Sequence, residues 1–284
     1  YGYANLKTLM EQAEFPILAA NAFTAEGELA MDEANTTFQL GDVTVGVFGL
    51  ATPETATKAH PAKLEGVTFL AEDELFNCAQ EQVDELTAEG CDYIICLGHL
   101  GIDAESTGNR SIDLLENVTG IDVFIDGHSH SEQSDIAEVT DGTGMVGDTI
   151  LTSTGTKLAN IGKMTITAEG QVSTELVNGY TEVDAETDAF VKNIQAQYED
   201  KLNEVVAKSD VDLVVMDPAT GNRLIRNQET NLGNLCADAY RDQGDADVAF
   251  VNGGGIRVSI PAGDITLGDI LQVHPFGNAL CVVE

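Results

Sequence analysis

Positive charge is scarce in this sequence. Only 13 lysines and arginines face 48 aspartates and glutamates, so the formal net charge is -35 over 284 residues. A field of this sign repels nucleic-acid backbones and anionic membranes, which argues against both as partners. A small anionic substrate would need positive charge supplied locally, by metal ions or a few placed arginines. The simpler alternative is that the charge serves solubility, in a salty or extracellular setting.

Paired cysteines, long apolar runs and a secretion signal are also missing. The five cysteines form no CxxC pair, which excludes zinc-ribbon and dithiol-redox sites. No apolar run reaches the 18 residues that a membrane-spanning helix needs. The first residues, YGYANLKTLMEQ, have neither an initiator Met nor the basic and apolar regions of a signal peptide. We therefore expect a mature form or an internal segment of a longer chain, without membrane insertion.

Two short apolar runs each end in a loop with glycine and histidine. Residues 93–101 read YIICLGHLG, and residues 121–130 read IDVFIDGHSH. Each run follows a predicted helix, over residues 73–89 and 110–117. A helix, a strand and a polar loop, used twice in succession, are typical of an α/β fold, in which functional loops follow the carboxyl ends of the strands.

The histidines of these loops predict a metal site. His99, His128 and His130 are three of only five histidines in the chain. Neutral imidazole is the commonest nitrogen ligand, and a strand end holds it rigidly. We expect GHSH to be extended, so that its two imidazoles point the same way. Hard ions also need carboxylates. Asp126 either supplies one or caps a turn.

The pattern changes after Glu132. Short β-prone runs over 136–180 predict antiparallel strands that close a first domain. Residues 187–209 carry an apolar stripe at helical spacing, which predicts one long helix between two domains, with a plain core helix as the alternative. A second α/β unit follows, with a helix over 232–242 and a strand over 247–251.

A second polar motif, NGGGIR, occupies residues 252–257. Its three glycines let backbone N–H groups approach an anion, and Arg257 supplies a planar donor fork. A tight turn with a surface arginine fits equally well. Phe276 lies in a Pro-Phe-Gly turn, where it is either a small core plug or a platform that stacks on a base.

Together these stretches resemble the 5′-nucleotidase family, which comprises nucleotidases, UDP-sugar hydrolases and 2′,3′-cyclic-nucleotide phosphodiesterases. Six stretches carry the resemblance and occur in the family's order: GLATPET at 49–55, GHLG at 98–101, GIDVFIDGHSH at 120–130, ETNLGNLCADAYR at 229–241, NGGGIR at 252–257 and HPFGN at 274–278. The resemblance implies part of a four-layer αββα metallophosphoesterase domain over 1–186, a linking helix over 187–209, and a truncated nucleotide-binding α/β domain over 210–284.

The resemblance also implies the roles of individual residues. His99, His128 and His130 would be ligands of two divalent metal ions, zinc, manganese or similar. Five residues would bind the substrate: Arg226, Asn252, Gly254, Arg257 and Phe276. Arg226 would take the place of an arginine that family members carry where this chain has Gln228.

The family's first motifs, DxH, GD and GNHD or GNHE, are absent, so the chain lacks the catalytic Asn/His pair and the remaining metal ligands. We predict that the parent protein is an extracellular, periplasmic or cell-surface hydrolase of nucleoside 5′-monophosphates, with UDP-sugars as further candidate substrates. This segment itself is predicted to be inactive, and it need not hold a metal. The alternatives are a 2′,3′-cyclic-nucleotide phosphodiesterase and a non-catalytic nucleoside-binding protein.

Overall fold

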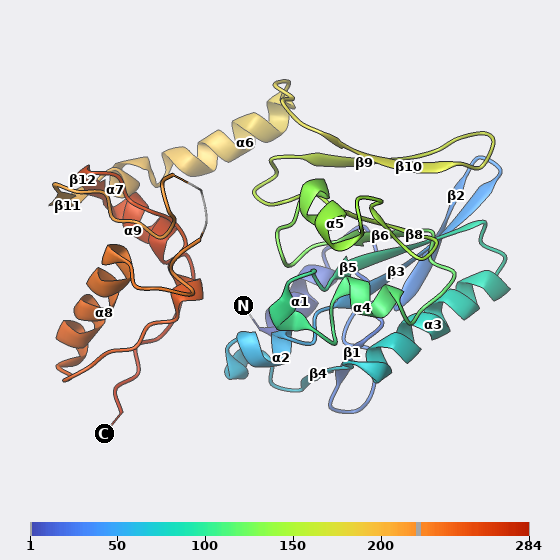
Figure 1. Cartoon of the computed structure of the whole chain (residues 1–284), viewed down its shortest axis with the longest axis horizontal. Coiled ribbons are helices and arrows are strands. Elements are labelled where there is room, and N and C mark those ends of the chain that lie inside the picture. Colours follow the sequence, from blue (N-terminus) through green and yellow to red (C-terminus); the bar gives the residue numbers. More distant parts are fainter. Residues whose placement is uncertain (1, 220–222, 284) are drawn as a thin grey trace. The chain divides into compact units, whose positions relative to one another are not determined.

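The structure is a computed structural model that describes residues 2–219 and 223–283. The chain divides into two compact units, residues 1–180 and 181–284. Each unit combines helices with short strands (Figure 1). The predicted α/β class is therefore confirmed. The first unit contains both histidine loops, and the second contains the glycine-rich loop.

A six-stranded mixed sheet forms the centre of the first unit, in the order β2-β3-β5-β6-β8-β7. The four inner strands run parallel, and the two edge strands pair antiparallel with their neighbours. The strands are β2 Asn35–Leu40, β3 Val43–Ala51, β5 Tyr93–His99, β6 Val123–Asp126, β7 Met145–Val146 and β8 Thr149–Ser153. Since parallel strands share one carboxyl edge, the loops after β3, β5 and β6 begin at the same edge of the sheet.

The inner strands are apolar because both faces of the sheet are covered. On one face, α3 (Asp73–Ala88) and α4 (Ser111–Leu115) contribute to the same core as the fully buried side chains of Phe48 and Phe124. On the other face, the two-stranded β9–β10 sheet packs through Met164 against strands β3 and β5 (Figure 1). The layers thus fix the strands whose ends carry the histidines.

The other elements of the first unit are short. They are α1 Tyr3–Met10, β1 Ala22–Thr24, α2 Thr55–Lys58, β4 Val67–Phe69, α5 Gln133–Val139, β9 Ile161–Ile166 and β10 Val172–Val177, with 3-10 turns at Pro61–Lys63 and Ala104–Ser106. The β-prone runs within 136–180 form β8, β9 and β10, and β9 pairs antiparallel with β10 as expected. The expectation is wrong for β8, which pairs antiparallel with β7 but parallel with β6. Strand β8 is short and mostly buried. Its sequence therefore does not reveal whether its neighbour in the sheet runs parallel or antiparallel to it.

The second unit is built around a smaller core. Its elements are α6 Ala185–Ala196, α7 Glu199–Leu202, β11 Val205–Ser209, α8 Asn231–Gly244, a 3-10 turn at Gly253–Gly255, β12 Gly263–Thr266 and α9 Leu267–Val273. Strands β11 and β12 pair antiparallel. Thr230 caps α8, and Thr266 with Asp269 forms a capping box at the start of α9. These caps place the start of α8 and the glycine-rich loop around one core, which includes Leu232 and Ile256.

Two predicted elements of the second unit are wrong. The single helix over 187–209 ends at Ala196, resumes for one turn as α7, and gives way to strand β11. Residues Val205 and Val206 form a strand and not a helix, because they pair with β12. No strand forms over 247–251 in the described part of the chain, where Phe250 is 94% exposed. The linking role of residues 187–209 stays a prediction.

Candidate functional site

The structure brings two of the predicted histidines together. His99 is the last residue of β5, and His128 follows the end of the neighbouring parallel strand β6. Their ring centroids lie 5.1 Å apart, with the ring planes tilted by 59°. Gly127 leaves room for this pairing, because a Cβ at that position would lie 3.0 Å from Nδ1 of His99. The shared carboxyl edge of the sheet therefore produces the juxtaposition.

The GHSH loop is not extended, contrary to the sequence-based expectation. His128 and His130 have φ angles of 73° and 58°, in the left-handed region that non-glycine residues rarely adopt. The loop turns back on itself, since the N–H of Ser129 donates to the carbonyl of Gly127 at 3.0 Å. As a result His130 is exposed, whereas His128 is partly buried. Backbone strain of this kind concentrates at functional sites.

Asp126 is a structural anchor for the loop that follows His99. Its Oδ1 accepts the backbone N–H groups of Leu100 at 3.0 Å and Gly101 at 3.1 Å, and its Oδ2 accepts the N–H of Gly101 at 3.1 Å. It also accepts the N–H of Gly127 at 2.8 Å. These bonds occupy the carboxylate of a residue that is only 8% exposed. Of the two roles open at the sequence level, the structure favours the turn cap.

Ser129 joins the two histidine loops. Its hydroxyl accepts the backbone N–H of Ile102 at 3.2 Å and shares a hydrogen bond of 2.8 Å with the hydroxyl of Ser131. The approach is close at Gly101, where φ is +75° and a Cβ would lie 3.0 Å from the nitrogen of Ser129. A glycine is therefore required at the point where the loops cross.

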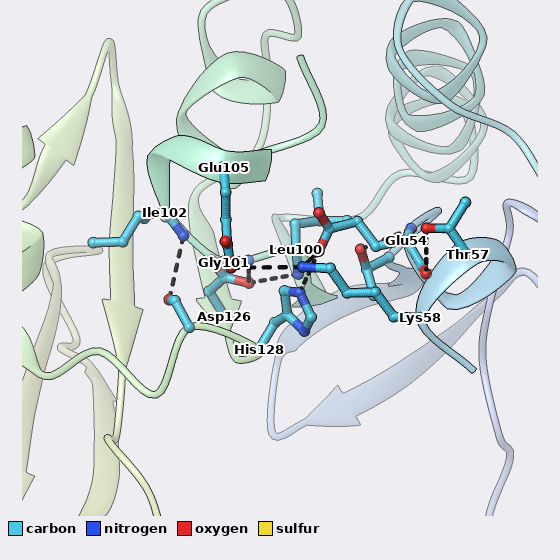
Figure 2. A network of polar contacts seen from close by, with 11 residues as sticks. Glu54, Thr57, Lys58, Leu100, Gly101, Ile102, Glu105, Asp126 and His128 are labelled. Atoms are coloured by element: carbon cyan, nitrogen blue, oxygen red, sulfur yellow. Dashed lines mark hydrogen bonds and ion pairs between the residues drawn. The ribbon is translucent and has the colours of Figure 1, made fainter. Parts of the chain in front are cut away.

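Glu54 is a residue of this site that the sequence analysis missed. It follows strand β3, and its Oε2 lies 2.7 Å from Nε2 of His128 and 2.8 Å from Nζ of Lys58. Figure 2 shows the three side chains converging beside the Asp126 anchor. The sequence did contain a signal, since Glu54 lies within GLATPET, one of the stretches that carried the family resemblance.

The electrostatics of the site keep His99 neutral. Burial lowers the pKa of His99, and the nearby His128 and His130 lower it further, while Asp126 acts in the opposite direction. Burial alone would raise the pKa of Glu54, but hydrogen bonds from Lys58 and His128 outweigh burial, and the pKa is lowered. At neutral pH the site therefore combines a neutral imidazole with an ionised carboxylate.

These donors suit part of a metal site. Imidazole nitrogen is a good ligand for zinc and similar ions, and the rings of His99 and His128 lie together at the sheet edge. A protein site for such an ion usually has three or more protein ligands. Within residues 2–219 and 223–283, no group of three or more His, Cys, Asp or Glu side chains is arranged to hold an ion. The histidines thus fit the chemistry of a metal site without completing it.

The glycine-rich loop of the second unit is a compact turn. Asn252 Oδ1 accepts the N–H of Gly254 at 3.0 Å, and an Nη1–H of Arg257 donates to the carbonyl of Gly254 at 3.1 Å. A Cβ on Gly253 would overlap the carbonyl of Ile225. The loop therefore packs directly against the segment that carries Arg226, which brings four of the five predicted substrate-binding residues into one neighbourhood.

Three of the chain's five arginines meet at this loop. A Cβ on Gly254 would lie 3.4 Å from Nη2 of Arg226. Arg223 donates to the carbonyl of Ile256 at 3.0 Å. Burial lowers the pKa of Arg223, and the positive charges of Arg257 and Arg226 lower it further, so all three guanidinium groups are close in space. The sequence analysis missed Arg223, although it lies only three positions before Arg226, which was among the predicted substrate-binding residues.

Phe276 contacts the same arginine group. The guanidinium carbon of Arg257 lies 5.7 Å from the centroid of the Phe276 ring, within the range of a cation–π contact. The Phe276 side chain is 54% exposed, which excludes the core plug. Its role as a stacking platform stays a prediction. Positive charge and an exposed aromatic ring thus adjoin each other in a chain of strongly negative charge.

Comparison with known proteins connects these features to one family. A family model described as the 5′-nucleotidase C-terminal domain matches residues 205–284. The trifunctional nucleotide phosphoesterase protein YfkN of Bacillus subtilis is 33% identical over 255 residues, which cover 84% of this chain and 16% of that protein. A 5′-nucleotidase of Vibrio parahaemolyticus is 28% identical over 316 residues, which cover 96% of this chain and 54% of the relative.

The chain belongs to the 5′-nucleotidase family. A solved Staphylococcus aureus structure, assigned as a candidate 5′-nucleotidase, shares the fold with a TM-score of 0.70 at 23% identity. That match covers 97% of this chain and 54% of the other. The chain thus spans about half the length of the 5′-nucleotidase relative and less of YfkN. In the described part of the chain, no helix has the length and hydropathy to cross a bilayer.

Proposed function

We propose that the chain is part of a nucleotide phosphohydrolase that acts on nucleoside 5′-monophosphates, with UDP-sugars as further candidate substrates. The pair of imidazoles at the carboxyl edge of the sheet carries this proposal, because it occurs in a chain whose relatives include proteins named 5′-nucleotidase. We propose an extracellular, periplasmic or cell-surface setting for the complete protein, which suits the net charge of -35 on this 284-residue chain.

The first unit would contribute metal ligands. His99 and His128 would hold a divalent cation, zinc, manganese or similar, and His130 would be a further ligand. Such ions, when bound, neutralise the charge of a phosphate group and lower the pKa of water. The chain's own task is to keep the His99 ring neutral and the loop after it fixed, and this is supported by the lowered pKa of His99 and by the Asp126 anchor.

The second unit would bind the substrate. Arg226 and Arg257, joined by Arg223, would pair with phosphate oxygens, for which planar guanidinium groups are well suited. Asn252 and Gly254 would shape the loop that presents them, and Phe276 would stack on the base. The contacts of the loop and the exposure of the aromatic ring support these assignments.

The 284-residue chain by itself is proposed to be inactive, because its histidines do not form a complete metal site in the described residues. The test compares phosphate release from AMP, with added Mn²⁺ or Zn²⁺, by this chain and by any longer product of the same gene. We expect turnover only from the longer product. Turnover of about 1 per second or more from the 284-residue chain would contradict its inactivity. No turnover from the longer product would contradict the function itself.

A second function has a specific observation in its favour. The Bacillus subtilis relative is named as a trifunctional nucleotide phosphoesterase, so a 2′,3′-cyclic-nucleotide phosphodiesterase is a second candidate. A panel of AMP, UDP-glucose and 2′,3′-cyclic AMP separates the two by relative kcat/KM. The remaining rival, a non-catalytic nucleoside-binding protein, would bind adenosine or AMP in calorimetry and release phosphate from no member of the panel.

A further inference from the structure

Glu54 reaches His128 across the end of an intervening strand. The carboxylate follows β3, the imidazole follows β6, and β5 with His99 lies between them in the sheet. The two side chains are separated by 74 positions in sequence and meet at 2.7 Å, from Oε2 to Nε2. Figure 2 shows the contact directly beside the Asp126 anchor. The bond therefore joins loops that the chain forms far apart.

The loop that carries Glu54 is itself well fixed. The backbone N–H of Glu54 donates to Oγ1 of Thr52, a residue only 5% exposed. The carbonyl of Glu54 accepts the backbone N–H groups of Thr57 at 3.0 Å and Lys58 at 2.7 Å, which closes helix α2. Lys58 lies one turn later, and its Nζ forms an ion pair with Oε2 of Glu54 at 2.8 Å. The carboxylate is thus held in place before it meets the imidazole.

Burial distinguishes this contact from an ordinary surface ion pair. The side chains of Glu54 and His128 are 15% and 22% exposed. Freely exposed pairs contribute little because solvent screens them and long side chains lose entropy. Here solvent is largely excluded, and the short His128 side chain sits on a strained backbone with φ 73°. A fixed acceptor is needed to hold the ring in one orientation.

A carboxylate can only accept hydrogen bonds, so the bonded Nε2 of a neutral imidazole must carry the hydrogen. We propose that Glu54 is a positioning residue that fixes the ring and tautomer of His128 and leaves Nδ1 as the atom that binds a divalent cation. The cation part of this inference rests on the proposed function. The tautomer part rests only on the contact between Glu54 and His128.

The first experiment needs no metal. Long-range ¹H–¹⁵N spectra of the metal-free 284-residue chain at pH 8 report which His128 nitrogen is protonated, with the signal assigned through His128→Asn. We expect Nε2–H in the native chain, retention of that pattern in Glu54→Gln, whose amide oxygen still accepts, and averaged nitrogen shifts in Glu54→Ala. An Nδ1–H tautomer in the native chain, or unchanged shifts in Glu54→Ala, would overturn the proposal.

The second experiment measures cation affinity. Zn²⁺ or Co²⁺ titrations of the same chain should show about 10–100-fold weaker binding in Glu54→Ala, the usual effect of losing a carboxylate that orients a ligating histidine. Glu54→Gln should recover part of the loss. Glu105→Gln is the matched control, because Glu105 is the second carboxylate that Lys58 contacts, at 3.6 Å. If Glu54→Ala and Glu105→Gln bind the cation equally well, the positioning role of Glu54 is wrong.

The two failures can be told apart. If a longer product of the gene hydrolyses AMP while Glu54→Ala leaves the tautomer and the cation affinity unchanged, the positioning role is wrong and the proposed function stands. If no product binds cations or hydrolyses nucleotides, the proposed function is wrong, and the spectra still decide whether Glu54 sets the tautomer of His128.

Discussion

At the scale of single residues, two carboxylates organise the histidine loops. Asp126 binds the backbone after His99, and Glu54 binds the ring of His128. Neither carboxylate needs to be a metal ligand to matter, because each fixes a loop that carries a histidine. Their contributions can be separated, since Asp126 acts on the backbone and Glu54 on a side chain.

Asp126→Asn should destabilise the first unit by about 1–3 kcal/mol. The substitution removes the charge that strengthens all of the hydrogen bonds to Asp126 and replaces Oδ2 by an NH2 group, which faces the buried N–H of Gly101 as donor against donor. Urea unfolding followed by circular dichroism measures the change. Asp103→Asn, at an exposed position in the same loop, is the control and should stay within about 0.5 kcal/mol of the parent. Equal effects of the two substitutions would contradict the anchor.

Sequence reasoning anticipated the positions of the two histidine loops but not all of their partners. The closeness of His99 and His128 could be expected, because both follow apolar runs that the α/β pattern predicts to be strands of one sheet. Glu54 was not, because its contact depends on the order of strands in the sheet, which local patterns do not encode. Asp126 could be placed next to the site, yet only the structure shows that backbone donors occupy its oxygens.

At the scale of elements, helix α4 illustrates how a short helix is held in place. Asp113 Oδ2 accepts the backbone N–H groups of Gly108 and Arg110, and Arg110 bonds both oxygens of the carboxylate through its guanidinium group, at 2.9 and 2.6 Å. The Arg110 side chain is the largest cause that lowers the pKa of Asp113, with burial acting against it. A helix of only five residues depends on such a cap.

Asp113→Asn should cost about 1 kcal/mol at pH 7. Because the folded pKa of Asp113 is lowered, its contribution is complete above the unfolded value, about 3.9, and is lost as the pH falls through the folded pKa. The difference in unfolding free energy between parent and variant should therefore narrow between pH 5 and pH 3 in urea titrations. In an Arg110→Met background, Asp113→Asn should lower the free energy of unfolding by less, because the guanidinium partner of the carboxylate is already absent. A difference that is independent of pH would contradict this account.

Gly98 in strand β5 leaves no room for a side chain. A Cβ there would overlap the ring of Phe124, which is fully buried on the neighbouring strand. Gly98→Ala should destabilise the first unit by about 1–3 kcal/mol. Adding Phe124→Leu should relieve part of that loss, so the double variant is more stable than the sum of the single changes predicts. Thermal unfolding measures the cycle, and strict additivity would contradict the steric explanation.

The wrong element predictions have a common physical cause. Residues 187–209 have a helical stripe, but a strand requires a partner, and the partner of β11 lies at residues 263–266. The run over 247–251 has strand propensity, yet in the described structure nothing pairs with it. The observed elements match the local sequence pattern where caps or buried faces determine them, as at Thr266. They differ from that pattern where pairing with a distant strand determines the structure, as in β11.

At the scale of the whole molecule, the excess of acidic residues is the dominant property. With a net charge of -35, the folded chain repels itself, and salt screens that repulsion. The melting temperature should rise by several degrees between 10 mM and 1 M NaCl, since each kcal/mol of relieved repulsion corresponds to about 2–4 °C in a domain of 150–250 residues. Scanning calorimetry measures the shift. An unchanged or falling melting temperature would show that the surface charges are already compensated.

The strand order of the first unit also has a consequence for the time course of folding. Glu54 and His128 meet only after β3, β5 and β6 have assembled side by side, although the two residues lie 74 positions apart. Parallel pairings of this kind form slowly, because the chain must close long loops before any contact stabilises them. During synthesis, a ribosome-bound chain that has exposed Glu54 and His99 but not His128 holds only one partner of the bond. The bond therefore cannot form until β6 and the loop after it have been synthesised.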